Sequence, residues 1–286
     1  MPKIFLVKKQ QLLITAIGFI LIIVLFFFVK TAPPSTTKKA VEPVANNTTI
    51  QFSDILAEAK KKITIQQNDR LAGLENAVTR GNVKEDKIHV YHQLARFWGD
   101  SAGMFIPYIY YTAEAAKLEN SEKSLTFAAQ QMVNRLLVVS DATMQNWLAS
   151  NAKVLLDKAI EINPNNDSSK ISLGACYMFG NISNNPMQGI LTVREIAQKN
   201  PNNLYAHLVL GLGGKKSNQY DKAAEHFLAI IKQQPKNIDA ILNAAECYEL
   251  MHNKTEAIKW YTVAKKLITN NADAIKEIDT RINELK

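Results

Sequence analysis

Glycine and proline are scarce in this chain of 286 residues, which contains 11 and 9 of them respectively. An all-β sandwich with many tight turns needs more of both, so that class is disfavoured. Only two cysteines are present, Cys176 and Cys247, and neither lies in a CxxC motif or a Cys/His cluster. We therefore expect neither a metal site nor a disulfide framework. Long stretches rich in Ala, Leu, Lys, Glu and Gln favour helices instead.

A strong charge on the main body of the chain is also missing. Residues 1–30 hold four lysines and no acid, and so supply +4 of the net +8, which leaves +4 for residues 31–286. That charge is mild, and no basic stripe alternates with aromatic residues. We therefore predict no nucleic-acid partner.

Residues 12–29 form a long uncharged run that is almost wholly apolar. Eighteen helical residues just cross a hydrocarbon core of about 30 Å, so residues 1–30 are predicted to be an N-terminal transmembrane anchor. The run exceeds the usual apolar region of a signal peptide, and Lys30 and Pro33 flank the best cleavage site poorly. An uncleaved signal anchor is favoured over a cleaved signal peptide.

The positive charge before the span is slightly larger than that after it, since the free N-terminal amine adds to Lys3, Lys8 and Lys9. The positive-inside rule then predicts a cytoplasmic N-terminus in a single-pass protein of the cytoplasmic (inner) membrane. The remainder of the chain would be periplasmic or extracellular.

Residues 31–49 contain three prolines, many threonines and no apolar periodicity, so we predict a disordered linker. Apolar residues recur at near-helical spacing from Phe52 to Val78, and Ser53 or Asp54 is a candidate N-cap. Residues 50–85 are therefore predicted to form one leading helix that packs on the first repeat. A juxtamembrane coiled coil is the weaker alternative.

An internal repeat dominates residues 86–286. The segments INPNN (162–166), KNPNN (199–203) and QQPKN (233–237) mark successive helix ends, and Pro201 and Pro235 are 34 residues apart. A further 34 residues lead to Thr269, in a segment that aligns with the third one except for its proline. This spacing is the period of helix–turn–helix repeats.

Each unit places small and large residues at matching positions. From Ile238, the helix A pattern runs Ile241, Ala244, Ala245 and Tyr248, and helix B continues it with Ala257, Tyr261 and Ala264. The units from Leu204 and Asp167 repeat the pattern, and the latter carries three extra residues in its turn around 181–185. Small residues let the two helices of a unit approach closely, and large ones fill the space between units. The small residues are Gly174, Gly211, Ala223, Ala245 and Ala257.

Upstream the pattern is weaker. Residues 91–98 match a helix A, residues 107–119 match a helix B, and residues 121–164 form an expanded unit whose helix A is predicted to be long and irregular from 122 to 139. About five repeats result, clearest over 167–271. Residues 272–286 are the predicted polar capping helix that such arrays need.

Because three units show the same pattern in register, residues 86–286 resemble the tetratricopeptide-repeat (TPR) superfamily. The resemblance implies an all-α superhelical solenoid of antiparallel helix pairs, whose concave face holds a peptide or a protein helix. Residues 184–227 are also similar to TPR subunits of bacterial cytochrome c maturation systems. Those subunits are membrane-anchored and present apocytochrome to the haem ligation machinery.

Motifs that would indicate catalysis or metal binding are incomplete. Residues 211–217 look like a phosphate loop, but Val209 and Lys216 stand where a P-loop requires Gly and Ser or Thr. His89 and His92 lie one helical turn apart without an evident third metal ligand. No catalytic triad or paired carboxylate is suggested, so we expect no catalytic residues, no enzymatic activity and no cofactor.

The register of the helix A positions predicts a partly apolar groove with charged ends, suited to an amphipathic helix or an extended peptide. The alternative is that these residues pack against the protein's own helices. Only Asn243 agrees with the pattern of TPRs that clamp a carboxylate, since Leu208 and Leu212 stand at the other places. The predicted groove residues are Ile171, Met178, Phe179, Tyr205, Leu208, Leu212, Lys215, Leu242, Asn243, Glu246 and Glu249.

These features favour a membrane-tethered scaffold or adaptor for protein or peptide partners, with cytochrome c maturation as its most specific version. Two alternatives stay open. One is an export-associated holdase chaperone or translocon-associated factor with a wide apolar groove. The other is a structural protein that oligomerises through the helix predicted within residues 52–80.

Overall fold

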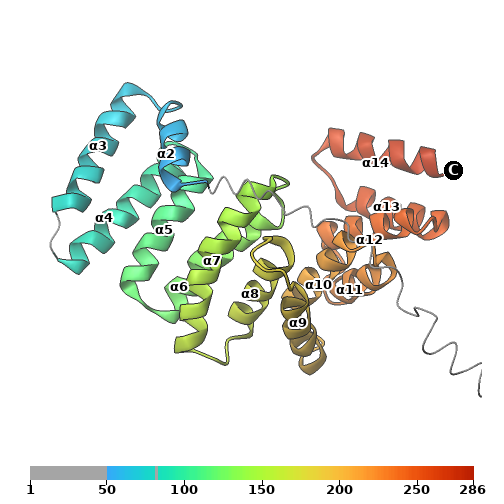
Figure 1. Ribbon diagram of the computed structural model, residues 1–286. Coiled ribbons are helices and arrows are strands. Elements are labelled where there is room, and N and C mark those ends of the chain that lie inside the picture. The colour runs from blue at the N-terminus through green and yellow to red at the C-terminus, as the bar shows by residue number, and fades with distance from the viewer. Residues whose placement is uncertain (1–49, 81–82) are drawn as a thin grey trace, which may run out of the picture. The chain divides into compact units, whose positions relative to one another are not determined.

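The computed structural model describes residues 50–80 and 83–286, which belong to one compact unit. These residues form α-helices and one short π-helix, with no strand among them, as predicted for an all-α chain (Figure 1). The helices are α2 (Phe52–Lys60), α3 (Ile65–Arg80), α4 (Lys84–Arg96), η1 (Phe97–Ser101), α5 (Phe105–Glu119), α6 (Glu122–Leu136), α7 (Ala142–Ile162), α8 (Asp167–Phe179), α9 (Met187–Lys199), α10 (Leu204–Lys216), α11 (Tyr220–Gln233), α12 (Ile238–Leu250), α13 (Lys254–Leu267) and α14 (Ala272–Leu285).

Consecutive helices pack in five pairs, which are α4–α5, α6–α7, α8–α9, α10–α11 and α12–α13 (Figure 1). Each pair also contacts the next one along the chain, for example α7 with α8 and α11 with α12. Thus each helix buries one face against its pair partner and another against the neighbouring pair. The described residues therefore contain a row of consecutive helix pairs, as the repeat pattern predicts.

The repeated Pro and Asn residues explain where the helices end and begin. Asn200 and Gln234 come directly after α9 and α11 in a non-helical conformation (φ −131°, ψ 86° and φ −128°, ψ 78°), as a proline in the next position demands. Three residues later Asn203 and Asn237 accept a hydrogen bond from the third backbone N–H of the next helix, each at 3.0 Å. One short segment therefore both stops a helix and caps the next.

Two glycines allow α8 and α9 to approach each other more closely than any side chain would permit. A Cβ built on Gly189 would lie 2.5 Å from the carbonyl oxygen of Gly174, and one on Gly174 would lie 2.5 Å from a methyl group of Val193. Ala223, Ala245 and Ala257 are fully buried in the later pairs. The predicted role of small residues in close helix packing is confirmed.

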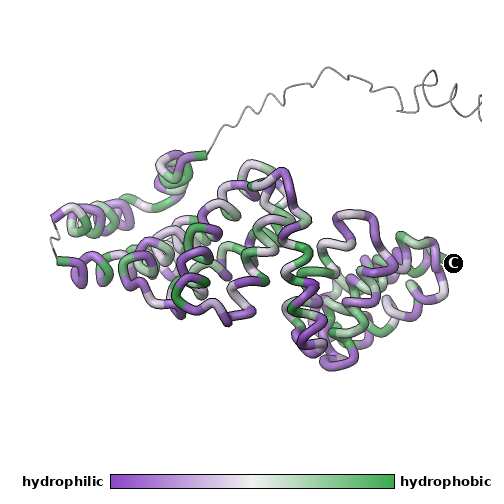
Figure 2. The backbone as a smooth tube through the Cα atoms, turned by 60° about the horizontal axis from the view of Figure 1, so that its bottom comes forward, coloured by the Kyte–Doolittle hydropathy of each residue, from purple (hydrophilic) through white to green (hydrophobic). Residues whose placement is uncertain are grey.

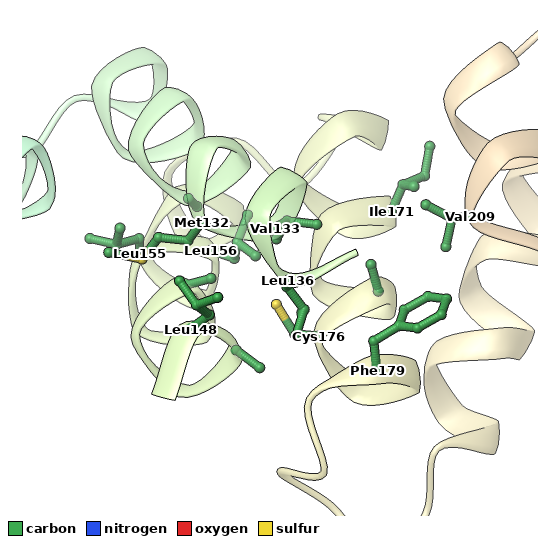
Figure 3. Packing of buried hydrophobic residues seen from close by; sticks show 14 of the residues in the cluster. Met132, Val133, Leu136, Leu148, Leu155, Leu156, Ile171, Cys176, Phe179 and Val209 are labelled. Carbon is green, nitrogen blue, oxygen red and sulfur yellow. The ribbon is translucent and has the colours of Figure 1, made fainter. Parts of the chain in front are cut away.

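The buried side chains form three clusters along the array. The first spans α5 to α10, the second spans α11 to α14, and the third joins α2–α5 with η1 around Trp98 and Leu71. Figure 3 shows part of the first cluster, in which Ile171 and Val209 lie side by side between α8 and α10. Hydrophobic and hydrophilic segments alternate along the helices, as expected when each has a buried face (Figure 2).

The prediction of a single leading helix is wrong. Residues 52–80 form two helices, and the break between them is stabilised at Thr64. The Thr64 hydroxyl accepts a hydrogen bond from the Gln67 backbone at 3.2 Å, and the Gln67 side chain accepts one from the Thr64 backbone at 2.9 Å. This reciprocal capping box starts a new helix. The N-cap of α2 is Gln51 rather than Ser53 or Asp54.

Helices α2 and α3 bury their apolar residues on their own chain. Leu71 is 1% exposed, and Phe52 stacks on Tyr110 of α5 with ring centroids 3.4 Å apart. Ile65 is the large apolar side chain of α2 and α3 that stays exposed, at 83%.

The expanded unit at residues 121–164 also differs from expectation. Its first helix, α6, is regular and ends at Leu136, whereas α7 is the long one, with 21 residues. Asp141 caps α7 by accepting a hydrogen bond from the backbone N–H of Met144 at 2.7 Å. The extra length of this unit therefore lies in helix B, because the cap at Asp141 separates it from α6.

The C-terminal helix α14 lies where the capping helix is predicted. α14 packs on α13 through Ile278 and Ile282, which are 5% and 9% exposed, and its other face is largely exposed. The predicted anchor at 12–29 and linker at 31–49 lie outside the described residues. Among the helices of residues 50–80 and 83–286, none combines the length and apolar character of a membrane span.

Candidate functional site

The candidate site is the surface formed by the first helices of consecutive pairs, α8, α10 and α12, together with α14. The predicted groove residues divide there into a buried set, a half-buried apolar set and a charged set. We call the half-buried members the groove strip. It comprises Tyr205, Leu208, Leu212, Lys215, Leu242, Asn243, Glu246 and Glu249.

Three predicted groove residues, all on α8, are buried instead of lining an open surface. Ile171 is 0% exposed, and Met178 and Phe179 are at most 9% exposed. Gly213 of α10 faces the Met178 side chain, and the Lys216 ammonium lies 5.3 Å from the centre of the Phe179 ring. These side chains pack against the protein's own α10, which is the alternative that the sequence leaves open for the groove residues.

Lys216 lies at the end of the groove strip that is next to α8. Its ammonium donates to the backbone carbonyl oxygens of Met178 and Phe179, at 3.3 and 3.4 Å, which are free at the C-terminal end of α8. Partial burial lowers the pKa of Lys216. The lysine therefore satisfies helix-end carbonyls and covers an aromatic face at once.

The apolar part of the strip comes from both α10 and α12. Leu208, Leu212 and Leu242 are half-buried, and they pack against the buried clusters with part of each side chain. The Tyr205 hydroxyl forms a hydrogen bond with the Ser172 hydroxyl of α8 at 3.0 Å, which fixes the ring between two repeats. These residues offer an apolar surface of fixed shape rather than mobile side chains.

Lys215 connects α10 to α12. Its ammonium donates to the Asn243 side-chain oxygen at 2.8 Å and to a Glu246 carboxylate oxygen at 2.7 Å. The lysine side chain is only 19% exposed, whereas that of Glu246 is 44% exposed. The Asn243 amide also donates to the backbone oxygen of Asp239 at 2.8 Å. The charges are thus held in one arrangement, and Glu246 keeps free acceptor sites toward solvent.

A second polar network, around Glu249, lies at the other end of the groove strip. Glu249 accepts hydrogen bonds from the Tyr261 hydroxyl at 2.6 Å and from Arg281 of α14 at 3.3 Å. Sequence reasoning assigned Tyr261 to packing and missed Arg281, because the capping helix has no counterpart in the repeat pattern. The position of Arg281 four residues after Glu277 on α14 gives no hint of its contact with α12.

The two histidines of the HVYH motif have separate hydrogen-bond partners. His92 contacts a Glu119 carboxylate oxygen at 2.7 Å and His89 contacts the Gln93 amide at 3.0 Å. They line a cleft of about 500 Å³ between α4, α5 and α6. In the described part of the chain, no three His, Cys, Asp or Glu side chains gather as a metal site would require.

Both cysteines are free and fully buried, as predicted for small packing residues. Burial raises the pKa of the Cys176 thiol to about 12, so this thiol stays protonated and unreactive in the folded chain. Figure 3 places it among the labelled core residues. The charged and apolar side chains of the groove strip are one amine (Lys215), two carboxylates (Glu246 and Glu249) and three leucines.

No protein-family model matches the sequence. No curated protein matches it either.

Several solved structures are similar in fold. MamA 41-end from Desulfovibrio magneticus is 17% identical with a TM-score of 0.44, and the match covers 64% of this chain and 95% of that one. YrrB, a TPR protein with an unusual peptide-binding site, is 17% identical with a TM-score of 0.42, over 72% and 97% of the two chains. A tetratricopeptide repeat protein from Parabacteroides merdae is 15% identical with a TM-score of 0.39, over 77% and 86%.

Proposed function

We propose that the chain is a scaffold or adaptor that binds a protein or peptide partner along the groove strip. The observation that carries this proposal is the surface shared by α10 and α12, where three half-buried leucines lie beside the network of Lys215, Asn243 and Glu246. Apolar contact supplies binding free energy at about 25 cal/mol per Å² buried, and the fixed charges orient the bound segment.

The occupant that fits best is an amphipathic helix or extended segment with apolar residues and a basic residue toward one end. Glu246 retains free acceptor sites, and Glu249 lies further along α12 at the C-terminal end of the strip. A holdase that accepts many unfolded chains needs a wide apolar groove. The polar network between α10 and α12 favours a more selective partner.

Photocrosslinking tests this proposal directly. A photoreactive amino acid at Leu242 in the strip should yield a defined crosslinked partner in cells, whereas the same amino acid at Lys232, exposed on α11, should not. Charge reversal at Glu246, Glu246→Lys, should reduce the crosslink from Leu242 at least about tenfold, since it repels a basic partner. Equal crosslinking from Leu242 and Lys232 would refute the groove as the binding surface.

We also propose that residues 12–29 tether this adaptor to the cytoplasmic membrane, with the repeats on the outer side. The support is the apolar run and the lysine distribution. Because Cys176 and Cys247 are both buried, a Ser35→Cys variant can be labelled with an impermeant maleimide without replacing the native thiols. Labelling in intact cells supports the outward topology. Labelling only after lysis would place the repeats on the cytoplasmic side and contradict this part of the proposal.

Cytochrome c maturation is the most specific function that we propose for the adaptor. It rests on the resemblance of residues 184–227, which form the end of the α8–α9 turn, α9, α10 and most of α11. An apocytochrome peptide with its haem-attachment motif should then crosslink to Leu242 and compete with the cellular partner. A peptide of the same composition in scrambled order is the matched control, and equal competition by both would reject this version.

A further inference from the structure

A cleft of about 540 Å³ opens between α2, α3, α4 and α5, far along the chain from the groove strip. Four aromatic rings and two carboxylates form most of its wall. We call it the tyrosine cleft, and its defining residues are Phe52, Glu75, Tyr91, Tyr110, Tyr111 and Glu114.

The rings are held in a fixed arrangement. Phe52 stacks on Tyr110 at an interplanar angle of 9° and meets Tyr111 edge-on at 5.6 Å and 88°. Tyr91 of α4 lies 6.2 Å from Tyr111, with the rings 29° from parallel. Aromatic faces carry negative potential, so the ring faces that are not covered by a stacked neighbour favour a positive guest.

The charged groups of the wall have the same sign. Glu75 and Glu114 line the cleft, and no lysine or arginine of the described residues lines it. Their lysine partners, Lys60 at 2.8 Å and Lys117 at 2.6 Å, lie outside the lining. Each carboxylate has two oxygens and about four acceptor positions, so both can accept further hydrogen bonds from a guest.

The tyrosine hydroxyls reflect the same environment. Burial, then the Glu114 carboxylate and Tyr91, raises the pKa of Tyr110 to about 12. Burial and nearby carboxylates, Glu75 first, also raise the pKa of Tyr111. The hydroxyls therefore stay neutral and contribute polar atoms to the wall without adding charge.

We propose that the tyrosine cleft binds the protonated amine of an alkylammonium ligand, such as a lysine side chain. An ammonium group has three N–H donors for the two carboxylates, and its methylene chain packs on the rings. An anion would face two carboxylates. A quaternary ammonium would leave their acceptor positions unused.

The experiment titrates n-butylammonium into the full chain in mild detergent and monitors saturation-transfer NMR signals of the ligand. We expect a dissociation constant on the order of millimolar, and at least tenfold weaker binding of neutral n-butanol. In the double variant Glu75→Gln, Glu114→Gln the affinity should fall about tenfold or more, as expected for the loss of charge-assisted hydrogen bonds. Circular dichroism verifies that the variant is folded.

The matched control is Glu195→Gln on α9, which removes a carboxylate that is likewise paired with a lysine, Lys199, but lies far along the chain from the cleft. Its affinity for n-butylammonium should equal that of the wild type. Tyr91→Leu removes one ring without changing charge and should also weaken binding. Equal binding of n-butanol, no binding at all, or an equal loss in Glu195→Gln would each overturn the proposal.

Two comparison ligands distinguish the source of the ammonium group. Stronger binding of a blocked peptide with a single lysine indicates a lysine of a partner protein, and stronger binding of spermidine indicates a free polyamine. Either result supports recognition of an alkylammonium. The cleft shares no residue with the groove strip, so its failure leaves the adaptor function standing, and the reverse also holds.

Discussion

At the scale of single residues, the turns inside two repeats contain non-glycine residues in a left-handed backbone conformation. Asn218 and His252 occupy equivalent positions, 34 residues apart, after α10 and α12, and both have φ of 58°. Asparagine tolerates this left-handed conformation, whereas histidine adopts it with a Cβ clash that costs about 1–2 kcal/mol without compensation. The requirement for positive φ leaves no signal at His252, because that position is neither a glycine nor an asparagine.

We therefore expect His252→Gly to stabilise the folded chain by about 1 kcal/mol, since glycine adopts positive φ without strain, offset by its larger unfolded-state entropy. Urea denaturation monitored by circular dichroism measures the change. Asn218→Gly is the matched control and should change the free energy of unfolding by less. A loss of stability in His252→Gly would show that the imidazole makes a stabilising contact that outweighs the strain.

Two glycines in different surroundings separate the effect of close helix packing from that of helix propensity. Gly189→Ala should destabilise the chain by about 1–3 kcal/mol, because its Cβ would lie 2.5 Å from the carbonyl oxygen of Gly174, a backbone atom. Gly73→Ala should instead stabilise α3 by up to about 1 kcal/mol, because nothing lies within 4 Å of the new Cβ. Equal effects in thermal denaturation would contradict the role of Gly189 in the α8–α9 contact.

At the scale of elements, a histidine pair joins α10 to α11. His207 Nε2 donates to the carbonyl oxygen of Pro201 at 2.9 Å, so its Nδ1 is the acceptor for His226 Nδ1–H at 3.0 Å. Burial, then His207 and then Arg194, lower the pKa of His226 to about 4. The pair is therefore built for two neutral imidazoles.

The sign of the pH effect is set by that lowered pKa. Between about pH 6.5 and pH 4 the unfolded chain binds a proton at His226 that the folded chain does not, so stability present above pH 6.5 is lost as the pH falls through this range. The melting temperature should drop from pH 7 to pH 5 by less in His226→Asn, whose amide can replace the donor. His89→Gln, exposed on α4, should keep the wild-type drop.

The helix boundaries show how far sequence reasoning reaches. The segments with Pro and Asn predicted the starts of α8, α10 and α12 because a cap and a stop are local effects. The break between α2 and α3 also has a local signal, the Thr64-x-x-Gln67 capping box, but the apolar spacing across it favoured a continuous helix. The long α7 has the Asp141 cap as a similar local signal.

At the scale of the whole described molecule, the groove residues show what register alone cannot predict. The predicted groove residues on α10 and α12 are half-buried in the structure. Those predicted on α8 are buried instead, because Gly213 lets Met178 lie against α10 and Lys216 reaches over Phe179. Burial here depends on a neighbouring repeat, and the contacts of Arg281 depend on a helix outside the pattern.

The division of the core into separate clusters has a consequence for cooperativity. Leu212 of α10 packs on both the first cluster and the second one, which extends from α11 to α14, and Leu204 and Leu208 of α10 also pack on the second. In an array whose units contact only their neighbours, a loss at one end weakens nearby units most. The C-terminal cluster should therefore open more readily than the first one when its cap is weakened.

The double variant Ile278→Ala, Ile282→Ala tests this expectation. Each buried isoleucine contributes about 2–5 kcal/mol relative to alanine, so α14 should detach or fray. Native-state hydrogen exchange should then accelerate strongly in α12 and α13 and little in α6 and α7, and the fixed contact between Glu249 and Arg281 should be lost with the cap. Because Glu249 belongs to the groove strip, partner crosslinking from Leu242 should weaken as well. Uniform acceleration over all helices would mean that the repeats unfold as one cooperative body and that the cap stabilises every unit equally.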